Sequence, residues 1–114
     1  MRFEVLVTAG AARDLDEIDD WIARHDSPAR ASHVVDRIES AIAALSRFPE
    51  RGAHPRELLA LGIGDYRETY FKPWRIVYRV EGKRVYVHLI ADGRRDMQAL
   101  LGRRLLRSAV PPSA

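Results

Sequence analysis

Alternating apolar and polar positions in the second half of the chain predict three consecutive strands. The segments Tyr66–Phe71, Arg75–Val80 and Arg84–Ala91 are rich in β-branched and aromatic residues, which favour strands over helices. Gly82 lies between the last two segments, and glycine can adopt the positive φ that a hairpin turn requires. We therefore expect an antiparallel arrangement with one apolar face and one face that carries arginines.

Helical periodicity dominates the first half of the chain, after a short alternating strand at Arg2–Val7. Ala11–His25 places its apolar residues on one helical face, and Thr8 can cap its N-terminus. Ser27-Pro28 is a helix start signal, so a second helix is expected over Pro28–Phe48. Because the break between the two helices is short, they should pack as an antiparallel hairpin.

The order β-α-α-β-β-β, followed by a C-terminal helix over Arg94–Arg107, predicts an α+β fold. The N-terminal helical hairpin would cover one face of a small, antiparallel-rich sheet. The other face stays open unless the C-terminal segment or a partner covers it. A connector over Ala53–Gly64 admits one turn of helix at Arg56–Leu61. We expect a single domain over residues 1–107 and a disordered tail over residues 108–114.

Composition excludes several classes of protein. Of the 114 residues, 46% are hydrophobic and 31% charged, which allows a core and argues against disorder. The absence of cysteine excludes disulfides and cysteine-based zinc sites. No apolar run reaches the roughly 18 residues of a membrane span, and the N-terminus lacks a signal-peptide pattern. We expect a cytoplasmic protein without a membrane partner. The histidines lack metal-ligand spacing, so we expect no metal and no cofactor.

The net charge of +3 conceals two unequal halves. Residues 1–57 carry 8 Lys/Arg and 11 Asp/Glu, whereas residues 58–114 carry 11 and 5. A basic C-terminal half indicates an acidic partner or nucleic acid, and a solvated basic surface is the other explanation.

A series of short motifs extends along the chain in a fixed order. They are Ala12-Arg13-Asp14-Leu15, Ile38, Ala41-Ile42, Leu45, Phe48-Pro49, Gly52, Arg56-Glu57-Leu58, Tyr66-Arg67, Trp74–Val80 and Gly93-Arg94-Arg95-Asp96. In this order they resemble the RelE/ParE superfamily of bacterial toxins, the toxin halves of type II toxin–antitoxin pairs. The resemblance covers Arg2 to about Leu105. It implies a compact β-α-α-β-β-β fold and a small co-encoded antitoxin that wraps the toxin with a helix and a strand-like segment.

The superfamily divides by target. RelE-like members are ribosome-dependent mRNA endonucleases, whereas ParE-like members poison DNA gyrase without nuclease chemistry. A nuclease must deprotonate a ribose 2′-hydroxyl, stabilise the phosphorane and protonate the leaving oxygen. In this chain Arg67, Arg75 and Arg79 would bind phosphate and His88 would be the acid, with Glu68 or Glu81 as base. A histidine packed within the sheet is the other interpretation of His88.

Two departures from the nuclease pattern favour the ParE-like branch. No lysine cluster precedes the first arginine of the sheet, and Gly93-Arg94-Arg95-Asp96 stands where those nucleases carry a catalytic Tyr or His. The resemblance therefore implies a gyrase inhibitor with no catalytic residue, whose target-binding residues are Arg94, Arg95 and Asp96. A RelE-like mRNA endonuclease and an inactive module that only binds antitoxin are the alternatives.

The antitoxin is expected to lay an amphipathic helix across the helical hairpin and an extended segment near the sheet. The candidate contacts are apolar residues of the hairpin and arginines of the sheet: Leu15, Ile18, Trp21, Ile22, Ile38, Arg67, Arg75 and Arg79. The apolar residues suit the protein core equally well, and the arginines suit local ion pairs equally well.

Overall fold

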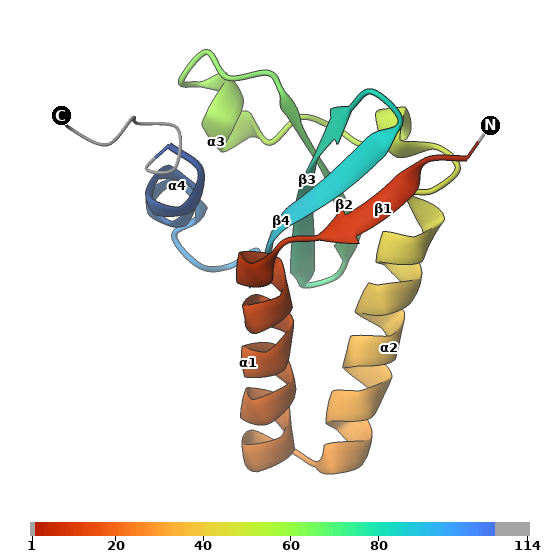
Figure 1. Ribbon diagram of the computed structural model, residues 1–114. Coiled ribbons are helices and arrows are strands. Elements are labelled where there is room, and N and C mark those ends of the chain that lie inside the picture. The colour runs from red at the N-terminus through yellow and green to blue at the C-terminus, as the bar shows by residue number, and fades with distance from the viewer. Residues whose placement is uncertain (1, 107–114) are drawn as a thin grey trace, which may run out of the picture.

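The computed structural model describes residues 2–106 and has the predicted α+β order (Figure 1). Arg107 and the predicted tail, residues 108–114, lie outside the described residues. The elements are β1 (Glu4–Val7), α1 (Ala9–His25), α2 (Pro28–Ala44), the 3-10 turn η1 (Pro49–Arg51), α3 (Arg56–Leu59), β2 (Tyr66–Phe71), β3 (Trp74–Glu81), β4 (Arg84–Asp92), α4 (Met97–Leu101) and the π-helical turn η2 (Gly102–Leu106).

The helix start signals in the sequence are confirmed, and one helix end is not. The Thr8 side chain accepts a hydrogen bond from Ala11 N–H at 3.2 Å, and Ser27 accepts one from Arg30 N–H at 3.0 Å. However, α2 ends at Ala44 instead of Phe48. The chain tightens there into three-residue hydrogen-bonded turns, and the residue before a proline is disfavoured in the α conformation.

The four strands form one mixed sheet in the order β1-β4-β3-β2. β3 is antiparallel to both β2 and β4, and Gly82 has the expected positive φ of 61° in the β3–β4 hairpin. β1 pairs in parallel with β4, because the helical hairpin carries the chain from the end of β1 back across the sheet. The register shifts between Val77, which pairs with Leu89, and Tyr78, which pairs with Val87, so His88 is the extra residue of a bulge in β4.

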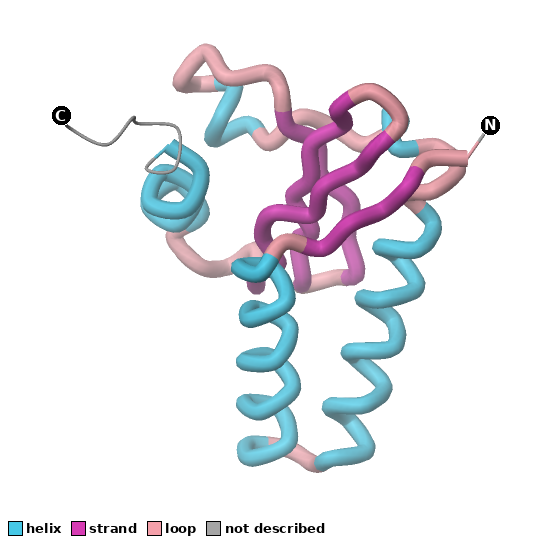
Figure 2. The backbone as a smooth tube through the Cα atoms, viewed as in Figure 1, coloured by secondary structure: helices cyan, strands magenta, loops and turns pink. Residues whose placement is uncertain are grey.

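Both faces of the sheet are covered, so neither is left open. Figure 2 shows the two long helices on one side, extending beyond the ends of the strands, with the short C-terminal helix on the other. On the hairpin face, Ile38 packs in one cluster with Ile76 and Tyr78. On the opposite face, α3 and the C-terminal segment bury a second cluster with Val77, Leu89 and Leu101, among others. Of the two possible covers for this face, the C-terminal segment or a partner, the structure shows the C-terminal segment.

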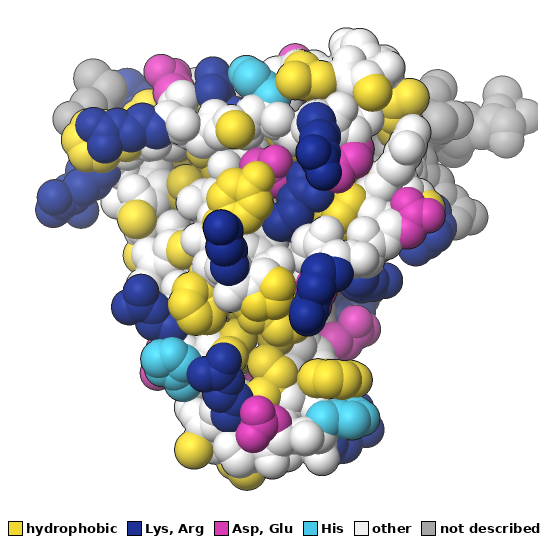
Figure 3. Space-filling view, turned by 180° about the vertical axis from the view of Figure 1, so that it is seen from behind, with side chains coloured by type: hydrophobic (Ala, Val, Ile, Leu, Met, Phe, Trp, Pro, Cys, Tyr) yellow, Lys and Arg dark blue, Asp and Glu magenta, His cyan; other side chains and the backbone are white. Residues whose placement is uncertain are grey.

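The prediction that one face of the sheet carries the arginines is wrong. Arg67 lies opposite Tyr78 in the sheet, whereas Arg75 lies opposite Tyr70. Because side chains alternate between faces along a strand, this register places Arg67 and Arg75 on opposite faces. On the side of the molecule that Figure 3 shows, Lys and Arg side chains are interspersed with hydrophobic ones. Among the described residues, no helix combines the length and hydropathy required to cross a membrane.

Candidate partner-binding site

The predicted target-binding residues lie in the turn between β4 and α4, which we call the Asp92–Asp96 turn. The Asp92 carboxylate accepts hydrogen bonds from Arg94 N–H and Arg94 Nε, both at 2.9 Å. These bonds from Arg94 lower the pKa of Asp92. The Arg95 N–H donates to the Asp92 carbonyl at 3.1 Å, and the Arg95 side chain is exposed. The turn thus directs both arginine side chains to the surface.

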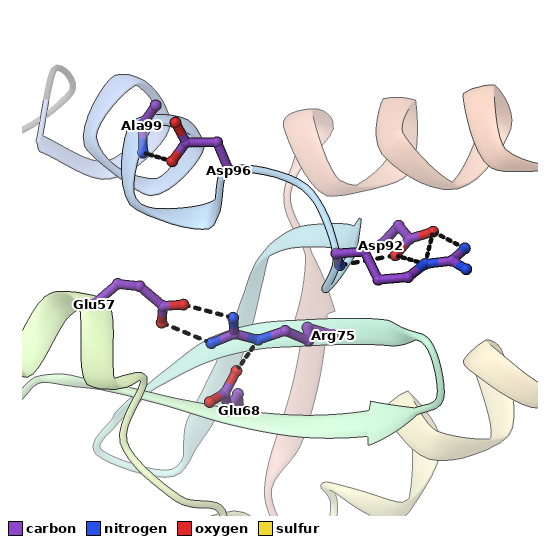
Figure 4. A network of polar contacts seen from close by, with 7 residues as sticks. Glu57, Glu68, Arg75, Asp92, Asp96 and Ala99 are labelled. Carbon is purple, nitrogen blue, oxygen red and sulfur yellow. Dashed lines mark hydrogen bonds and ion pairs between the residues drawn. The ribbon is translucent and has the colours of Figure 1, made fainter.

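Asp96 is the N-cap residue of α4. Its carboxylate accepts a hydrogen bond from Ala99 N–H at 3.1 Å and caps the N-terminus of α4 (Figure 4). The sequence predicted that this helix begins at Arg94. The cap explains why it begins at Met97 instead. Of the three predicted target-binding residues, Arg94 and Arg95 therefore offer side chains to a partner most directly.

A buried ion network lies beneath the turn. Arg75 is 9% exposed and donates from Nε to Glu68 at 2.6 Å. Its Nη1 and Nη2 atoms donate to the two Glu57 oxygens at 2.8 and 2.9 Å (Figure 4). Hydrogen bonding to Arg75 lowers the pKa of Glu57 from 4.5 to about 2. Two carboxylates therefore neutralise the Arg75 guanidinium within the fold.

Gly93 connects the turn to this network. A β-carbon at Gly93 would lie 2.8 Å from Cδ and 3.1 Å from Cγ of Arg75, and 3.2 Å from the Pro73 carbonyl oxygen. Real β-carbons essentially never approach other atoms this closely, so only glycine lets the turn rest on the Arg75 stem. The position of Arg94 and Arg95 thus depends on the packing of Arg75.

The other nuclease candidates do not converge on one centre. Arg67 Nη1 donates to the Gly52 carbonyl at 2.8 Å. His88 packs edge-on against Tyr66 with ring centroids 5.6 Å apart, and its Nε2 is buried without a hydrogen-bond partner among the described residues. Burial lowers the pKa of His88. Arg79 lies over the Tyr66 ring, 5.8 Å from its centroid.

The predicted antitoxin contacts on the hairpin divide by exposure. Ile18, Ile22 and Ile38 are core residues, with exposures of 8%, 6% and 0%. Leu15 is partly buried against the same core. Trp21 is different because 56% of its surface is exposed. Its ring stacks on His25 with centroids 4.2 Å apart and planes 13° from parallel. Among these five, Trp21 presents the most surface to a partner.

A groove of about 430 Å³ lies between α1 and the Asp92–Asp96 turn. We call it the α1–turn groove, because α1 forms one wall and the Asp92–Asp96 turn the other. Its lining residues are Asp14, Glu17, Ile18, Trp21, Trp74, Ile90, Ala91, Asp92, Arg94 and Arg95. The groove therefore combines Ile18 and Trp21, predicted antitoxin contacts, with Arg94 and Arg95, predicted target contacts. Sequence spacing carried no signal that these four residues share one site.

The C-terminal segment is fixed to the end of this groove by an ion pair. The Asp14 carboxylate accepts from Arg104 Nη1 at 2.9 Å and from Arg104 Nη2 at 3.0 Å. Its Oδ2 also accepts from the Ile90 N–H at 3.0 Å. Asp14 thus connects α1, β4 and η2, and it is saturated by groups of the protein itself. Within residues 2–106 there is no group of three His, Cys, Asp or Glu residues that could hold a metal ion.

Comparison with known proteins gives one consistent assignment. The family model described as "ParE toxin of type II toxin-antitoxin system, parDE" matches residues 5–97. Toxin ParE3 of Caulobacter vibrioides is 34% identical over 100 residues, which cover 88% of this chain and 96% of that protein.

Solved structures show the same fold. A chain of the chromosomal ParDE TA system from P. aeruginosa superposes with a TM-score of 0.68 at 24% identity, covering 80% of this chain and 96% of that one. A chain of the Mycobacterium tuberculosis toxin–antitoxin complex RelBE2 gives a TM-score of 0.56 at 23% identity, covering 81% and 99%. Because both identities are low, these structures support the fold and not a particular target.

Proposed function

The chain belongs to the ParE family of toxins from type II toxin–antitoxin systems, and from this membership we propose that it inhibits DNA gyrase and is neutralised by a cognate antitoxin. The protein would act in the cytoplasm, where gyrase is found. It would act through a binding surface, with no covalent chemistry of its own. Arg94 and Arg95 would contact the target, with Asp96 holding the turn that carries them.

The state of Arg75 is the observation that favours gyrase inhibition over mRNA cleavage. A ribonuclease needs a cation that is free to stabilise the charge on a phosphorane. Arg75 instead directs three of its nitrogens to Glu57 and Glu68. Releasing it would leave buried carboxylates unpaired, which costs about 3–5 kcal/mol. His88 packs against the Tyr66 ring, and Arg67 donates a hydrogen bond to the Gly52 carbonyl, so neither is free for catalysis.

The exposed arginines of the Asp92–Asp96 turn support a protein–protein surface. Arginine and tryptophan are enriched among the residues that dominate binding energy in interfaces. The groove places Arg94 and Arg95 beside Trp21 and an apolar floor. Such a combination of an apolar centre and charged edges is typical of protein interfaces.

A supercoiling assay tests the gyrase proposal. Folded, antitoxin-free protein is added to purified gyrase and relaxed plasmid, with and without ATP, and supercoiled and cleaved plasmid are measured. We expect loss of supercoiling and accumulation of cleaved plasmid. The double variant Arg94→Ala, Arg95→Ala should inhibit at least about tenfold less, because interface arginines commonly contribute more than 1 kcal/mol. Arg30→Ala, Arg47→Ala is the control, since it removes the same charge from exposed positions outside the groove.

Unaltered supercoiling in the presence of folded wild-type protein would refute gyrase inhibition. A ribosome-bound mRNA cleavage assay would then test the endonuclease alternative through Arg67, Arg75 and His88. Restoration of supercoiling by equimolar cognate antitoxin is expected if neutralisation is direct. Inhibition that persists with the antitoxin bound would refute that part of the proposal.

A further inference from the structure

The floor of the α1–turn groove is apolar and comes from three different elements. Ile18 belongs to α1, Trp74 to the start of β3, and Ile90 and Ala91 to the end of β4. Trp74 is only partly buried, so it adds aromatic surface at the bottom of the groove. A floor of this kind suits the apolar face of an amphipathic segment.

The two walls of the groove carry opposite charge. On the α1 wall, Asp14 is already saturated by Arg104, whereas Glu17 is exposed and has no hydrogen-bond partner among the described residues. On the turn wall, Arg94 is paired with Asp92, whereas the Arg95 side chain has no such partner within the described part of the chain. Within residues 2–106, Glu17 and Arg95 interact with Arg104 and Asp92 only through charge at a distance, so the groove offers one carboxylate and one guanidinium that can still form direct ion pairs with a partner. A partner segment with a carboxylate on one edge and a cation on the other would match it in only one orientation.

Trp21 is held in position at the rim of this groove before any partner arrives. Its ring stacks on His25, and His25 Nδ1 lies 2.8 Å from the Trp21 carbonyl oxygen. An exposed aromatic side chain that is already ordered loses less conformational entropy when a partner covers it. Trp21 is thus well suited to anchor a bound segment.

We propose that one amphipathic segment of the antitoxin fills the α1–turn groove, with a carboxylate at Arg95 and a cation at Glu17, and that it neutralises the toxin by covering Arg95 directly. This inference rests on the proposed function, because it assigns both partners to one site. The physical reason is the shared lining of the groove. A segment seated between Trp21 and Trp74 occupies the space beside Arg95, so gyrase cannot reach that side chain. Neutralisation then requires no conformational change in the toxin.

The two tryptophans of the chain make this groove directly observable. The sequence contains only Trp21 and Trp74, and both line the groove. Toxin labelled with 5-fluorotryptophan should therefore give two ¹⁹F resonances, which Trp21→Phe assigns. We expect both resonances to shift when unlabelled cognate antitoxin is added to saturation, with complex formation followed by light scattering. A complex that forms without shifting either resonance would overturn the proposal.

Paired variants test whether antitoxin and gyrase share the groove. Arg95→Glu and Trp21→Ala should each weaken antitoxin binding at least about tenfold and weaken gyrase inhibition as well. The controls are Arg47→Glu, which makes the same charge reversal as Arg95→Glu, and Phe48→Ala, which removes another exposed aromatic side chain. They lie beside Ser46, whose carbonyl bonds to Phe3 at the start of β1, and so at the opposite end of the sheet. The controls should change both activities less than about twofold.

The outcomes distinguish this inference from the proposed function. Loss of gyrase inhibition by Arg95→Glu with unchanged antitoxin affinity would overturn the shared groove and leave gyrase inhibition intact. Shifted ¹⁹F resonances and weakened antitoxin binding, with a wild-type toxin that does not inhibit gyrase, would refute the gyrase target and retain the antitoxin site. Failure of folded wild-type toxin to bind its antitoxin would refute both. Far-UV circular dichroism verifies that each variant is folded.

Discussion

Removing the cation from the buried network at Arg75 should destabilise the protein strongly at neutral pH. Arg75→Met retains an aliphatic stem for Gly93 to pack against but leaves Glu57 and Glu68 without their partner. Glu68 is 4% exposed and Arg75 is 9% exposed, so water replaces little of the lost interaction. Breaking a buried pair in this way costs about 3–5 kcal/mol.

The pKa of Glu57 gives an independent measure of this magnitude. Lowering it from 4.5 to about 2 corresponds to about 3 kcal/mol at neutral pH, because each pKa unit represents about 1.4 kcal/mol. The Glu57 side chain is 15% exposed, and solvent screening reduces its share to about 2 kcal/mol. Leaving the buried Glu68 without its partner adds to this loss. A loss of this size is a large fraction of the 5–15 kcal/mol that stabilises a typical domain.

The loss should depend on pH with a definite sign. In the wild type, the lowered pKa of Glu57 provides stability that is fully present above pH 4.5 and disappears as the pH falls toward 2. Without Arg75, burial instead favours the protonated form of Glu57, so acid relieves the variant. The difference in unfolding free energy between wild type and Arg75→Met should therefore be largest at pH 7 and smaller at pH 4.

Urea unfolding followed by circular dichroism at both pH values measures this difference. Arg79→Met is the matched control, because Arg79 lies on the same strand, is 40% exposed, and is 3.8 Å from Glu81. It should lose less than about 1 kcal/mol. The triple variant Arg75→Met, Glu57→Gln, Glu68→Gln should recover part of the loss, since it buries no unpaired charge. The reasoning fails if Arg75→Met loses no more than Arg79→Met, or if its loss is the same at pH 4 and pH 7.

Two further predictions concern the turn and the buried histidine. Gly93→Ala should cost about 1–3 kcal/mol in urea unfolding, because its β-carbon would lie 2.8 Å from Arg75 Cδ. Gly64→Ala, whose nearest contact is 4.0 Å away, should cost less than about 0.5 kcal/mol, and equal losses would contradict the close-packing argument. Burial lowers the pKa of His88, so the unfolded chain binds more protons below pH 6.5 and wild-type stability should fall between pH 7 and pH 5. His88→Phe should reduce this slope in urea unfolding while His33→Phe retains it, and an unchanged slope in His88→Phe would refute the assignment.

Local interactions explain why much of the fold could be predicted from the sequence. The caps at Thr8 and Ser27 and the glycine turn at Gly82 each involve residues within a few positions of one another. Their conformational preferences therefore act before distant parts of the chain meet. Apolar periodicity likewise indicated the helical hairpin and the three consecutive strands. The order of elements, the α+β class and the family resemblance all followed from such short-range patterns.

Strand register and long-range packing decided the candidate site. The pairing of β2 with β3 places Arg67 and Arg75 on opposite faces of the sheet, although both had been expected on one arginine-bearing face. Sequence patterns predicted neither this register nor the pairing of Arg75 with Glu57 across the chain. Whether an arginine is neutralised or free depends on which side chains reach it in space.

The α1–turn groove illustrates the same division. The sequence by itself determined the helix that carries Trp21 and the motif that carries Arg95. Only the tertiary structure placed them on one groove, because the parallel pairing of β1 with β4 brings the first half of α1 beside the end of β4. Parallel pairing joins segments far apart in the chain, and its register depends on packing between layers instead of on neighbouring residues.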